Sequence, residues 1–136
     1  MTELQDPPAE TLVPIDLRVP ADPSMSKVLR LAASGVASLW GFSVAEIEEI
    51  KLAVSEVLIA LIEHGAGDRV DVGFLVSKEE FHVHGAALVG PEFDIAHPDL
   101  ALSRVVLDDV CTEHGLGVVG DEVRINATLR RPFPGV

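Results

Sequence analysis

The sequence predicts an α/β fold, a two-layer sandwich in which a mixed β-sheet is covered by helices on one face. Three segments place apolar residues at helical spacing, and others alternate them with polar residues as half-buried strands do. Their order along the chain is β-α-α-β-β-α-β-β, and blocks of this kind favour one sheet with helices packed on it. A chain of 136 residues, 48% of them apolar, is long enough for one domain with a hydrophobic core.

The start of the chain divides into a tail and a first strand. Residues 1–10 carry two prolines and little apolar content, so we expect a flexible tail, followed by a single domain over residues 11–136. Residues 11–19 alternate apolar and polar side chains imperfectly, which predicts a strand. Pro14 lacks a backbone donor and therefore places this strand at a sheet edge or marks a bulge.

A first helix is expected to begin at Asp22 and Pro23, an N-cap acid followed by a proline in the first turn. It should run to about Trp40 and stop at Gly41. Gly35 lies in the middle of this helix and costs about 1 kcal/mol relative to alanine. Close packing of another backbone, such as that of a second subunit, would explain this glycine.

A second, longer helix begins at Ser43, because Ser43 and Glu46 form a capping-box pattern. Its apolar residues recur every three or four positions and predict a buried stripe. The stripe consists of Ile47, Ile50, Val54, Val57, Leu58 and Leu61. The glycine-containing residues 65–68 are expected to end the helix.

The second half of the chain is expected to contain a hairpin, a shorter helix and further strands. In order, these are a strand at 70–76, a turn at 77–80, a strand at 81–87, a loop at 90–99, a helix at 100–110, the start of a strand at 110–113 and a final strand at 122–130. Gly115, Leu116 and Gly117 follow the third helix, and we interpret them as a turn.

Charge and composition exclude several classes of protein. The formal net charge is −12 with only ten basic residues, so direct nucleic-acid binding is not expected, whereas an acidic surface suits a basic protein partner. No apolar run approaches the roughly 20 residues that span a bilayer, and the first residues lack a signal-peptide pattern. The single cysteine, Cys111, excludes an internal disulfide and is interpreted as a small buried residue. We therefore expect a cytoplasmic protein without membrane contact.

The second helix carries the most specific pattern in the chain. Residues 43–65 contain the groups Glu49-Ile50-Lys51, Val54-Ser55-Glu56 and His64-Gly65. Their spacing resembles the E-I-K-x-x-V-S-E-x-x-x-N-x-x-x-H-G motif of bacterial anti-sigma factors, the switch-protein serine kinases of the GHKL ATPase fold. That resemblance implies a GHKL-like sandwich, which agrees with the element order.

Three nucleotide-binding motifs of that family are changed in this chain. Ala60 stands where the family has the asparagine that coordinates Mg²⁺, and a methyl group offers no oxygen ligand. Residues 84–90 replace the adenine-binding D-x-G-x-G motif and contain no aspartate, and Asp94 lies too far along the chain to substitute. Residues 99–102 replace the glycine-rich lid. We therefore expect neither ATP nor Mg²⁺ as a cofactor, and we expect kinase activity to be lost.

Glu56 keeps the position of the family glutamate that aligns the attacking water or hydroxyl. The resemblance makes Glu56 the remnant of a catalytic base. The alternative is a solvated carboxylate beside Glu49 and Glu63, which recur every seven residues on one helix face. We assign no catalytic and no nucleotide-binding residue from the sequence.

The first helix carries a candidate surface for a protein partner. Lys27, Arg30, Ser34 and Ser38 recur at three- and four-residue spacing and line one face. The resemblance places Arg30 where a related anti-sigma factor has an arginine that contacts both the sigma factor and its antagonist. We expect Lys27, Arg30 and Ser34 to bind a partner; the alternative is a polar face that keeps the helix soluble.

The histidines are candidates for a metal site. His82 and His84 alternate on one strand face, which is compatible with a metal pair, while His64, His97 and His114 lie elsewhere in the sequence. Zinc sites usually need three or four ligands. We interpret the histidines as solvent-facing and expect no metal site.

Taken with the resemblance, these features predict an anti-sigma factor that sequesters an alternative sigma factor by protein–protein binding. Its second partner would be an anti-anti-sigma protein of the STAS type, and homodimerisation is compatible with the family. Two alternatives stay open: an active ATP-dependent serine kinase that uses Glu56, and a dimeric regulatory scaffold that binds no sigma factor.

Overall fold

The structure, a computed structural model, describes residues 12–132, so the expected tail at residues 1–10 lies outside the described part. The expected order of helices and strands is confirmed. The elements are β1 (Val13–Pro20), α1 (Met25–Leu39), α2 (Val44–His64), β2 (Gly65–Val76), β3 (Glu80–Val89), α3 (Pro98–Val110), β4 (Glu113–Val119) and β5 (Glu122–Arg130). None of these helices is long and apolar enough to cross a lipid bilayer.

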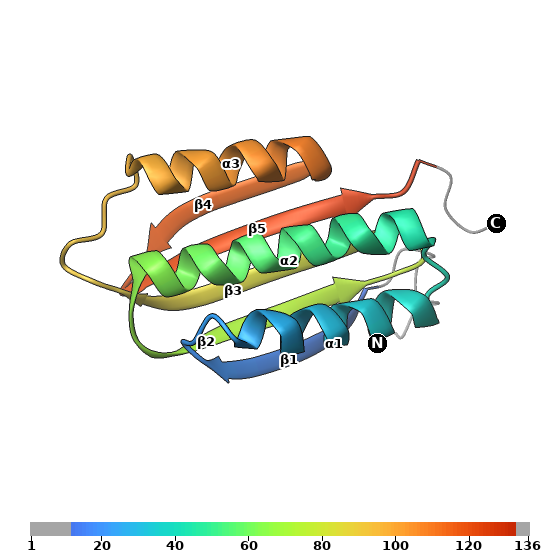
Figure 1. Ribbon diagram of the computed structural model, residues 1–136, viewed down its shortest axis with the longest axis horizontal. Coiled ribbons are helices and arrows are strands. Elements are labelled where there is room, and N and C mark those ends of the chain that lie inside the picture. The colour runs from blue at the N-terminus through green and yellow to red at the C-terminus, as the bar shows by residue number, and fades with distance from the viewer. Residues whose placement is uncertain (1–11, 133–136) are drawn as a thin grey trace, which may run out of the picture.

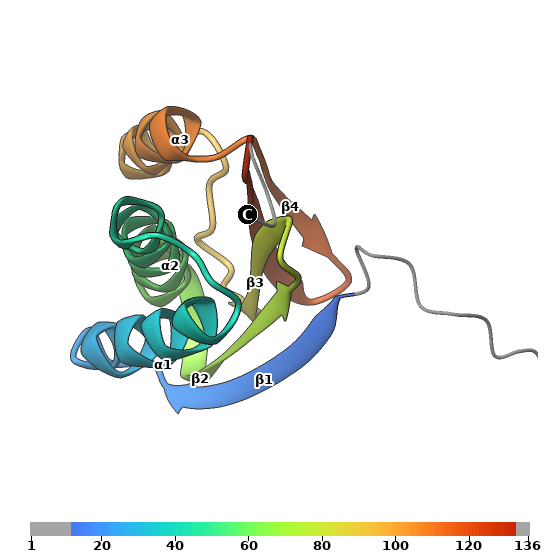
Figure 2. The same cartoon turned by 90° about the vertical axis from the view of Figure 1, so that its right-hand side faces the viewer.

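The strands form one sheet in the order β1-β2-β3-β5-β4, and all three helices lie on the same face of it (Figures 1 and 2). The two-layer α/β sandwich is therefore confirmed. Each neighbouring pair is antiparallel, however, where the sequence predicted a mixed sheet. Helix α3 connects β3 to β4, and these two strands run in the same direction. Because β5 lies between these two strands, no parallel ladder forms.

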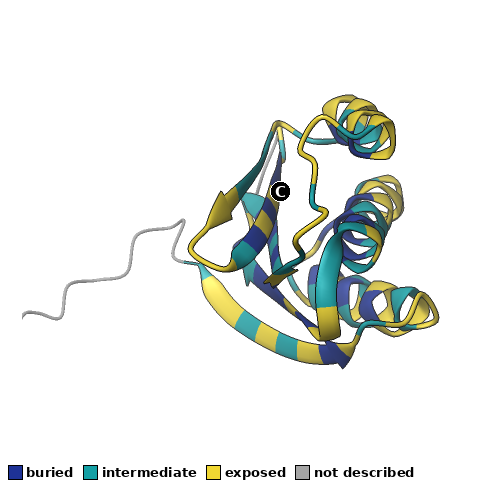
Figure 3. Ribbon diagram, turned by 90° about the vertical axis from the view of Figure 1, so that its left-hand side faces the viewer, coloured by how far each residue is buried: buried dark blue, intermediate teal, exposed yellow. Residues whose placement is uncertain are grey.

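The core lies between the sheet and the inner faces of the helices (Figure 3). Most of the predicted α2 stripe is buried, and only Ile47 is half-buried. From the sheet, Phe74 and Phe81 are fully buried with their ring centroids 5.2 Å apart. Burying one large apolar side chain stabilises a fold by about 1.5–3 kcal/mol. The apolar side chains that α2 and the sheet bury against each other therefore stabilise the fold.

The first helix begins later than the sequence predicted. Ser24 is the N-cap residue and Met25 the first helical residue, whereas Asp22 was expected to cap it. The Asp22 carboxylate instead accepts a hydrogen bond from the backbone N–H of Ser24 at 2.9 Å, in the turn before the helix. Gly41 follows the helix with a φ of +80°, a conformation that glycine adopts without strain.

The expected end of the second helix is confirmed, but one predicted turn proves to be strand. The capping box at Ser43 is confirmed, and α2 ends at His64 and β2 begins at once with Gly65, with a register shift between Ala66 and Asp71. The Gly115–Gly117 segment belongs to β4 and pairs with β5, so its interpretation as a turn was wrong. Gly65 is the C-cap residue of α2 and so marks the end of the helix as expected, whereas Gly115 and Gly117 lie within an edge strand.

Candidate functional site

Glu56 and Ala60 line a narrow cleft between α2 and α3. This cleft has a volume of about 10 Å³, and Leu100 and Leu107 from α3 close its far side. Glu56 is half-buried there, whereas Glu49 and Glu63 are exposed. The heptad spacing on α2 therefore does not make Glu56 an ordinary solvated carboxylate.

The serine of the Val54-Ser55-Glu56 group has a structural contact of its own. Its hydroxyl lies 3.2 Å from the hydroxyl of Ser26 on α1, within hydrogen-bond distance. This contact joins the two helices across a partly buried interface. Ser55 therefore contributes to the packing of α1 against α2.

A much larger hollow lies at the C-terminal end of α2, below the loop that leads into α3. Its volume is about 620 Å³. Among the described residues its lining includes four carboxylates and two histidines but no lysine or arginine. The polar lining consists of Glu63, His64, Glu92, Asp94, His97 and Asp99. This hollow is therefore strongly acidic.

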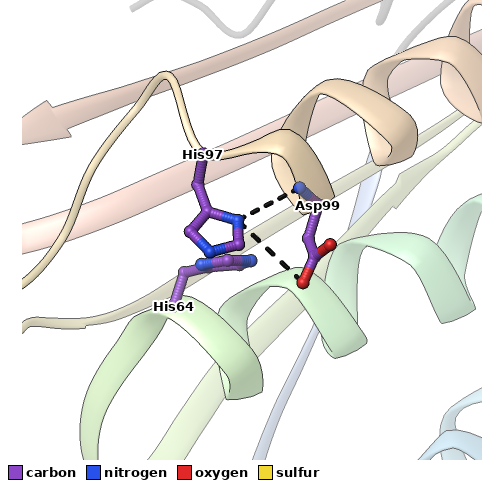
Figure 4. A group of neighbouring side chains, drawn as sticks. All are labelled: His64, His97 and Asp99. Carbon is purple, nitrogen blue, oxygen red and sulfur yellow. Dashed lines mark hydrogen bonds and ion pairs between the residues drawn. The ribbon is translucent and has the colours of Figure 1, made fainter.

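His64, His97 and Asp99 come together at this hollow (Figure 4). One potential ligand atom from each residue lies within 4.8 Å of the others, and the two imidazole rings have centroids 4.9 Å apart. His64 ends α2, while His97 is the N-cap of α3, where its Nδ1 accepts from the backbone N–H of Asp99 at 3.1 Å. The sequence offered no signal for this grouping, because the strands between the two helices bring distant residues together.

His82 and His84 lie on the opposite face of the sheet, which carries no helix. His82 Nδ1 is 2.6 Å from the hydroxyl of Thr128, and the His84 ring packs on Gly73, where a Cβ would meet it at 2.4 Å. Burial, and then the nearby His84, lower the pKa of His82, which favours a neutral ring. Both side chains are half-buried rather than fully solvent-facing as expected. Among residues 12–132, they gather no third ligand.

The expected partner-binding residues lie on the outer face of α1. Lys27 and Arg30 are exposed and Ser34 is half-buried, and no ion pair joins either cation to another described residue. Exposed apolar side chains share this helix; Leu31 is 69% exposed. Gly35 is exposed too, and an added Cβ would meet nothing within 4 Å. Close packing within this chain therefore does not explain Gly35.

Cys111 is half-buried at the end of α3. Burial, followed by the carboxylates of Glu49 and Asp108, raises the pKa of its thiol to about 12. Because the thiolate is the effective nucleophile, this cysteine is a poor nucleophile at neutral pH.

Comparison with known proteins identifies the family. No family model matches the chain. It is similar to the serine-protein kinase RsbW of Bacillus pumilus, with 33% identity over 87% of this chain and 81% of that protein. The same kinase from Oceanobacillus iheyensis is 30% identical over 77% of this chain and 82% of the relative. The kinase from Bacillus subtilis is 32% identical over 82% of this chain and 76% of the relative. This chain belongs to the RsbW family. The chain is therefore a member of a family of anti-sigma factors and partner-switching serine kinases that has a GHKL-like fold.

Membership of the RsbW family corrects the expectation about cofactors. The relatives are named serine-protein kinases, and serine-protein kinases use ATP and Mg²⁺. The expectation of neither cofactor is therefore wrong. It gave decisive weight to Ala60, although the oxygen ligands that Mg²⁺ takes can come from other positions in the fold.

The hollow at the end of α2 fits a magnesium-bound nucleotide in volume and in donor type. Small-molecule pockets have volumes of roughly 300–1,000 Å³, and this hollow has about 620 Å³. Glu63, Asp94 and Asp99 present carboxylates to it, and Mg²⁺ prefers such oxygen ligands. Asp94, which lies too far along the chain to match the family's adenine-binding aspartate, also lines this hollow.

Proposed function

We propose that this protein is a cytoplasmic anti-sigma factor that sequesters an alternative sigma factor by protein–protein contact and is antagonised by an anti-anti-sigma protein of the STAS type. Membership of the RsbW family supports the functional class. The outer face of α1 is the observation that supports the mode of binding.

That face combines cations with exposed apolar side chains. Protein interfaces are enriched in arginine and in large apolar residues, and arginine pairs with carboxylates through its planar, two-pronged donor group. Arg30 and Leu31 are adjacent and both exposed, in a chain whose net charge is −12. A local cationic and apolar surface on an acidic protein selects a partner segment with carboxylates and apolar side chains.

Charge reversal at Arg30 tests this proposal. The sigma factor is first identified by co-purification with the untagged native protein, and its affinity for wild-type and Arg30→Glu protein is then measured by calorimetry. We expect at least tenfold weaker binding, about 1.4 kcal/mol, with an unchanged Tm because Arg30 is exposed. Arg124→Glu, an exposed arginine on the helix-free face of the sheet, is the matched control.

Two outcomes count against the proposal. Equal affinities of the Arg30→Glu and wild-type proteins remove α1 from the interface. If no sigma factor co-purifies, the chain is better described as a regulatory scaffold, and a homodimer would then be the principal assembly to measure.

A second candidate function is that of an ATP-dependent serine kinase acting on the anti-anti-sigma protein. The activity of the relatives, which are serine-protein kinases, favours it, as does the half-buried position of Glu56. ATP supplies the phosphoryl group when it is bound, and Glu63 and Asp94 are carboxylates available to Mg²⁺. Glu56 would orient or deprotonate the serine hydroxyl of the substrate.

Phosphoryl transfer from labelled ATP to the anti-anti-sigma protein tests the kinase candidate. A general base contributes about 10²–10⁴-fold, so Glu56→Gln should lower the rate by at least a hundredfold. The control is Glu49→Gln, the exposed glutamate seven residues earlier on α2. Transfer that is equally fast in Glu56→Gln protein would exclude Glu56 as the base.

A further inference from the structure

We propose that His64, His97 and Asp99 bind a transition-metal cation, with Zn²⁺ as the best match, in the hollow at the C-terminal end of α2. The three residues come from the end of α2 and the start of α3 (Figure 4). They are the one group of three or more potential metal ligands this close together among residues 12–132.

The strongest observation is the state of His64. Its side chain is only 10% exposed, and its Nε2 is buried without a hydrogen-bond partner. The carboxylate of Glu63 lies 3.9 Å away, which is too long for a hydrogen bond. Buried polar atoms in proteins almost always have a partner. A cation bound in the hollow would give this nitrogen a partner.

The charge of the hollow favours a cation. Glu63, Glu92, Asp94 and Asp99 contribute carboxylates to its lining, and no lysine or arginine lies among the described lining residues. Carboxylates grouped around a partly enclosed space attract a cation more strongly than the same groups dispersed in water, because the local dielectric constant is lower.

The types of ligand atom select the metal. Imidazole nitrogens favour Zn²⁺ and related transition metals, whereas Mg²⁺ and Ca²⁺ prefer oxygen ligands throughout. Two histidines and one carboxylate form a three-residue site that leaves a fourth position for water or another ligand. The site therefore discriminates against the Mg²⁺ that accompanies a nucleotide.

The geometry allows closure around a metal. Zinc–nitrogen bonds of about 2.0–2.1 Å put tetrahedral ligand atoms roughly 3.3 Å apart, so the atoms now within 4.8 Å must approach further. His64 is the buried, fixed ligand. The side chains of His97 and Asp99 are 45% and 65% exposed, so these two, rather than the buried His64, would have to move.

The Nδ1 of His97 is directed towards Asp99. Because Nδ1 accepts from the backbone N–H of Asp99, it carries no proton in the neutral ring. The Asp99 carboxylate lies 3.9 Å from the same nitrogen. A metal between these two atoms would replace the hydrogen bond at the helix N-cap and connect α3 to the end of α2.

The test uses the untagged full chain after removal of metals with a chelator. Titration with ZnCl₂ by calorimetry should show one site per chain, and CoCl₂ should give the visible absorption of a four-coordinate site. His97→Asn and Asp99→Asn should each weaken Zn²⁺ binding at least tenfold. Asparagine at position 97 preserves an N-cap residue, so α3 should remain intact.

His114→Asn is the matched control. His114 Nε2 lies 2.5 Å from a carboxylate oxygen of Asp108, a histidine–carboxylate pair without a second histidine. Its replacement should leave Zn²⁺ affinity and the cobalt spectrum unchanged. A hundredfold excess of MgCl₂ should not displace Zn²⁺.

Three results would each overturn the proposal: no Zn²⁺ binding by the wild-type chain, unchanged affinity in the His97 and Asp99 variants, or displacement by Mg²⁺. The buried His64 is tested separately with His64→Asn, which should abolish the cobalt spectrum. If this variant does not fold, the two variants at the exposed positions decide the outcome.

Discussion

The two ends of α2 differ in how completely their polar groups are paired. At the N-terminal end, Ser43 and Glu46 exchange hydrogen bonds with each other's backbone N–H groups, at 3.1 and 2.7 Å. Arg131 then pairs with the same Glu46 carboxylate at 3.1 Å. At the C-terminal end, the Nε2 of His64 is buried without a partner beside an acidic hollow.

Because of this difference, one end of α2 serves the stability of the fold and the other end is available to bind a ligand. Paired groups at the start of α2 fix the helix on the sheet and leave nothing for a ligand to satisfy. An unpaired nitrogen at the other end lowers the stability of the isolated chain and supplies binding energy when a suitable ion arrives. Buried groups that lack a partner are therefore the place to look for ligands.

The largest effect is expected from removing Arg131. Its side chain is 12% exposed, donates to the backbone carbonyls of Lys78 and Gly41 and to Glu46, and stacks on Phe42 with Cζ 4.6 Å from the ring centroid. Arg131→Ala should lower the free energy of unfolding by about 2–3 kcal/mol, measured by urea denaturation.

Arg130→Ala is the control for this prediction. Arg130 is the neighbouring residue, but its side chain is 52% exposed and pairs with the exposed Glu113. Exposed ion pairs contribute little, so the loss should be clearly smaller than for Arg131→Ala. Equal losses would show that the N-terminal end of α2 is not specially stabilised by Arg131.

Removing the capping hydroxyl should have the next largest effect. Ser43→Ala deletes the acceptor for the Glu46 backbone N–H and should cost about 1 kcal/mol of unfolding free energy. Ser38→Ala, an exposed serine near the end of α1, is the matched control and should have little effect. A Ser43→Ala protein as stable as the wild type would contradict the capping role.

The other end of α2 should respond in the opposite direction. His64→Leu replaces an unpaired buried nitrogen with an apolar side chain of similar size, so in chelator-treated protein it should raise the unfolding free energy by up to about 1 kcal/mol. His114→Leu removes a paired histidine and should not stabilise. A loss of stability in His64→Leu would mean that this histidine is satisfied in the metal-free chain.

The smallest effect concerns acid stability. Burial acts to raise the pKa of Glu46, but hydrogen bonds from Ser43 and Arg131 outweigh it and hold the pKa below its usual 4.5. A lowered carboxyl pKa stabilises the fold above about pH 4.5, and this contribution is lost as the pH falls through the lower, folded-state pKa. Glu46→Gln should therefore flatten the dependence of unfolding free energy on pH between about pH 3 and pH 5.

Much of the fold was predictable because its signals are local. The α2 stripe follows helical spacing, the Ser43 box caps the helix, and the proline in β1 marks an edge strand; all three agree with the structure. The GHKL family was recognisable for the same reason, since its most specific motif lies within one helix. The strand around Gly115 was not predictable, because pairing with a neighbouring strand, rather than the residues themselves, makes that segment extended.

The sequence by itself determined the order of the elements, the buried face of α2, the capping of its first turn and the family. The tertiary structure decided that every strand pair is antiparallel and that Arg131 hydrogen-bonds to Glu46 at the N-terminal end of α2. It also decided that His64, His97 and Asp99 lie close together at the C-terminal end. The physical reason is range: spacing and capping act within a few residues, whereas these contacts join segments that only the folding of the sheet brings together.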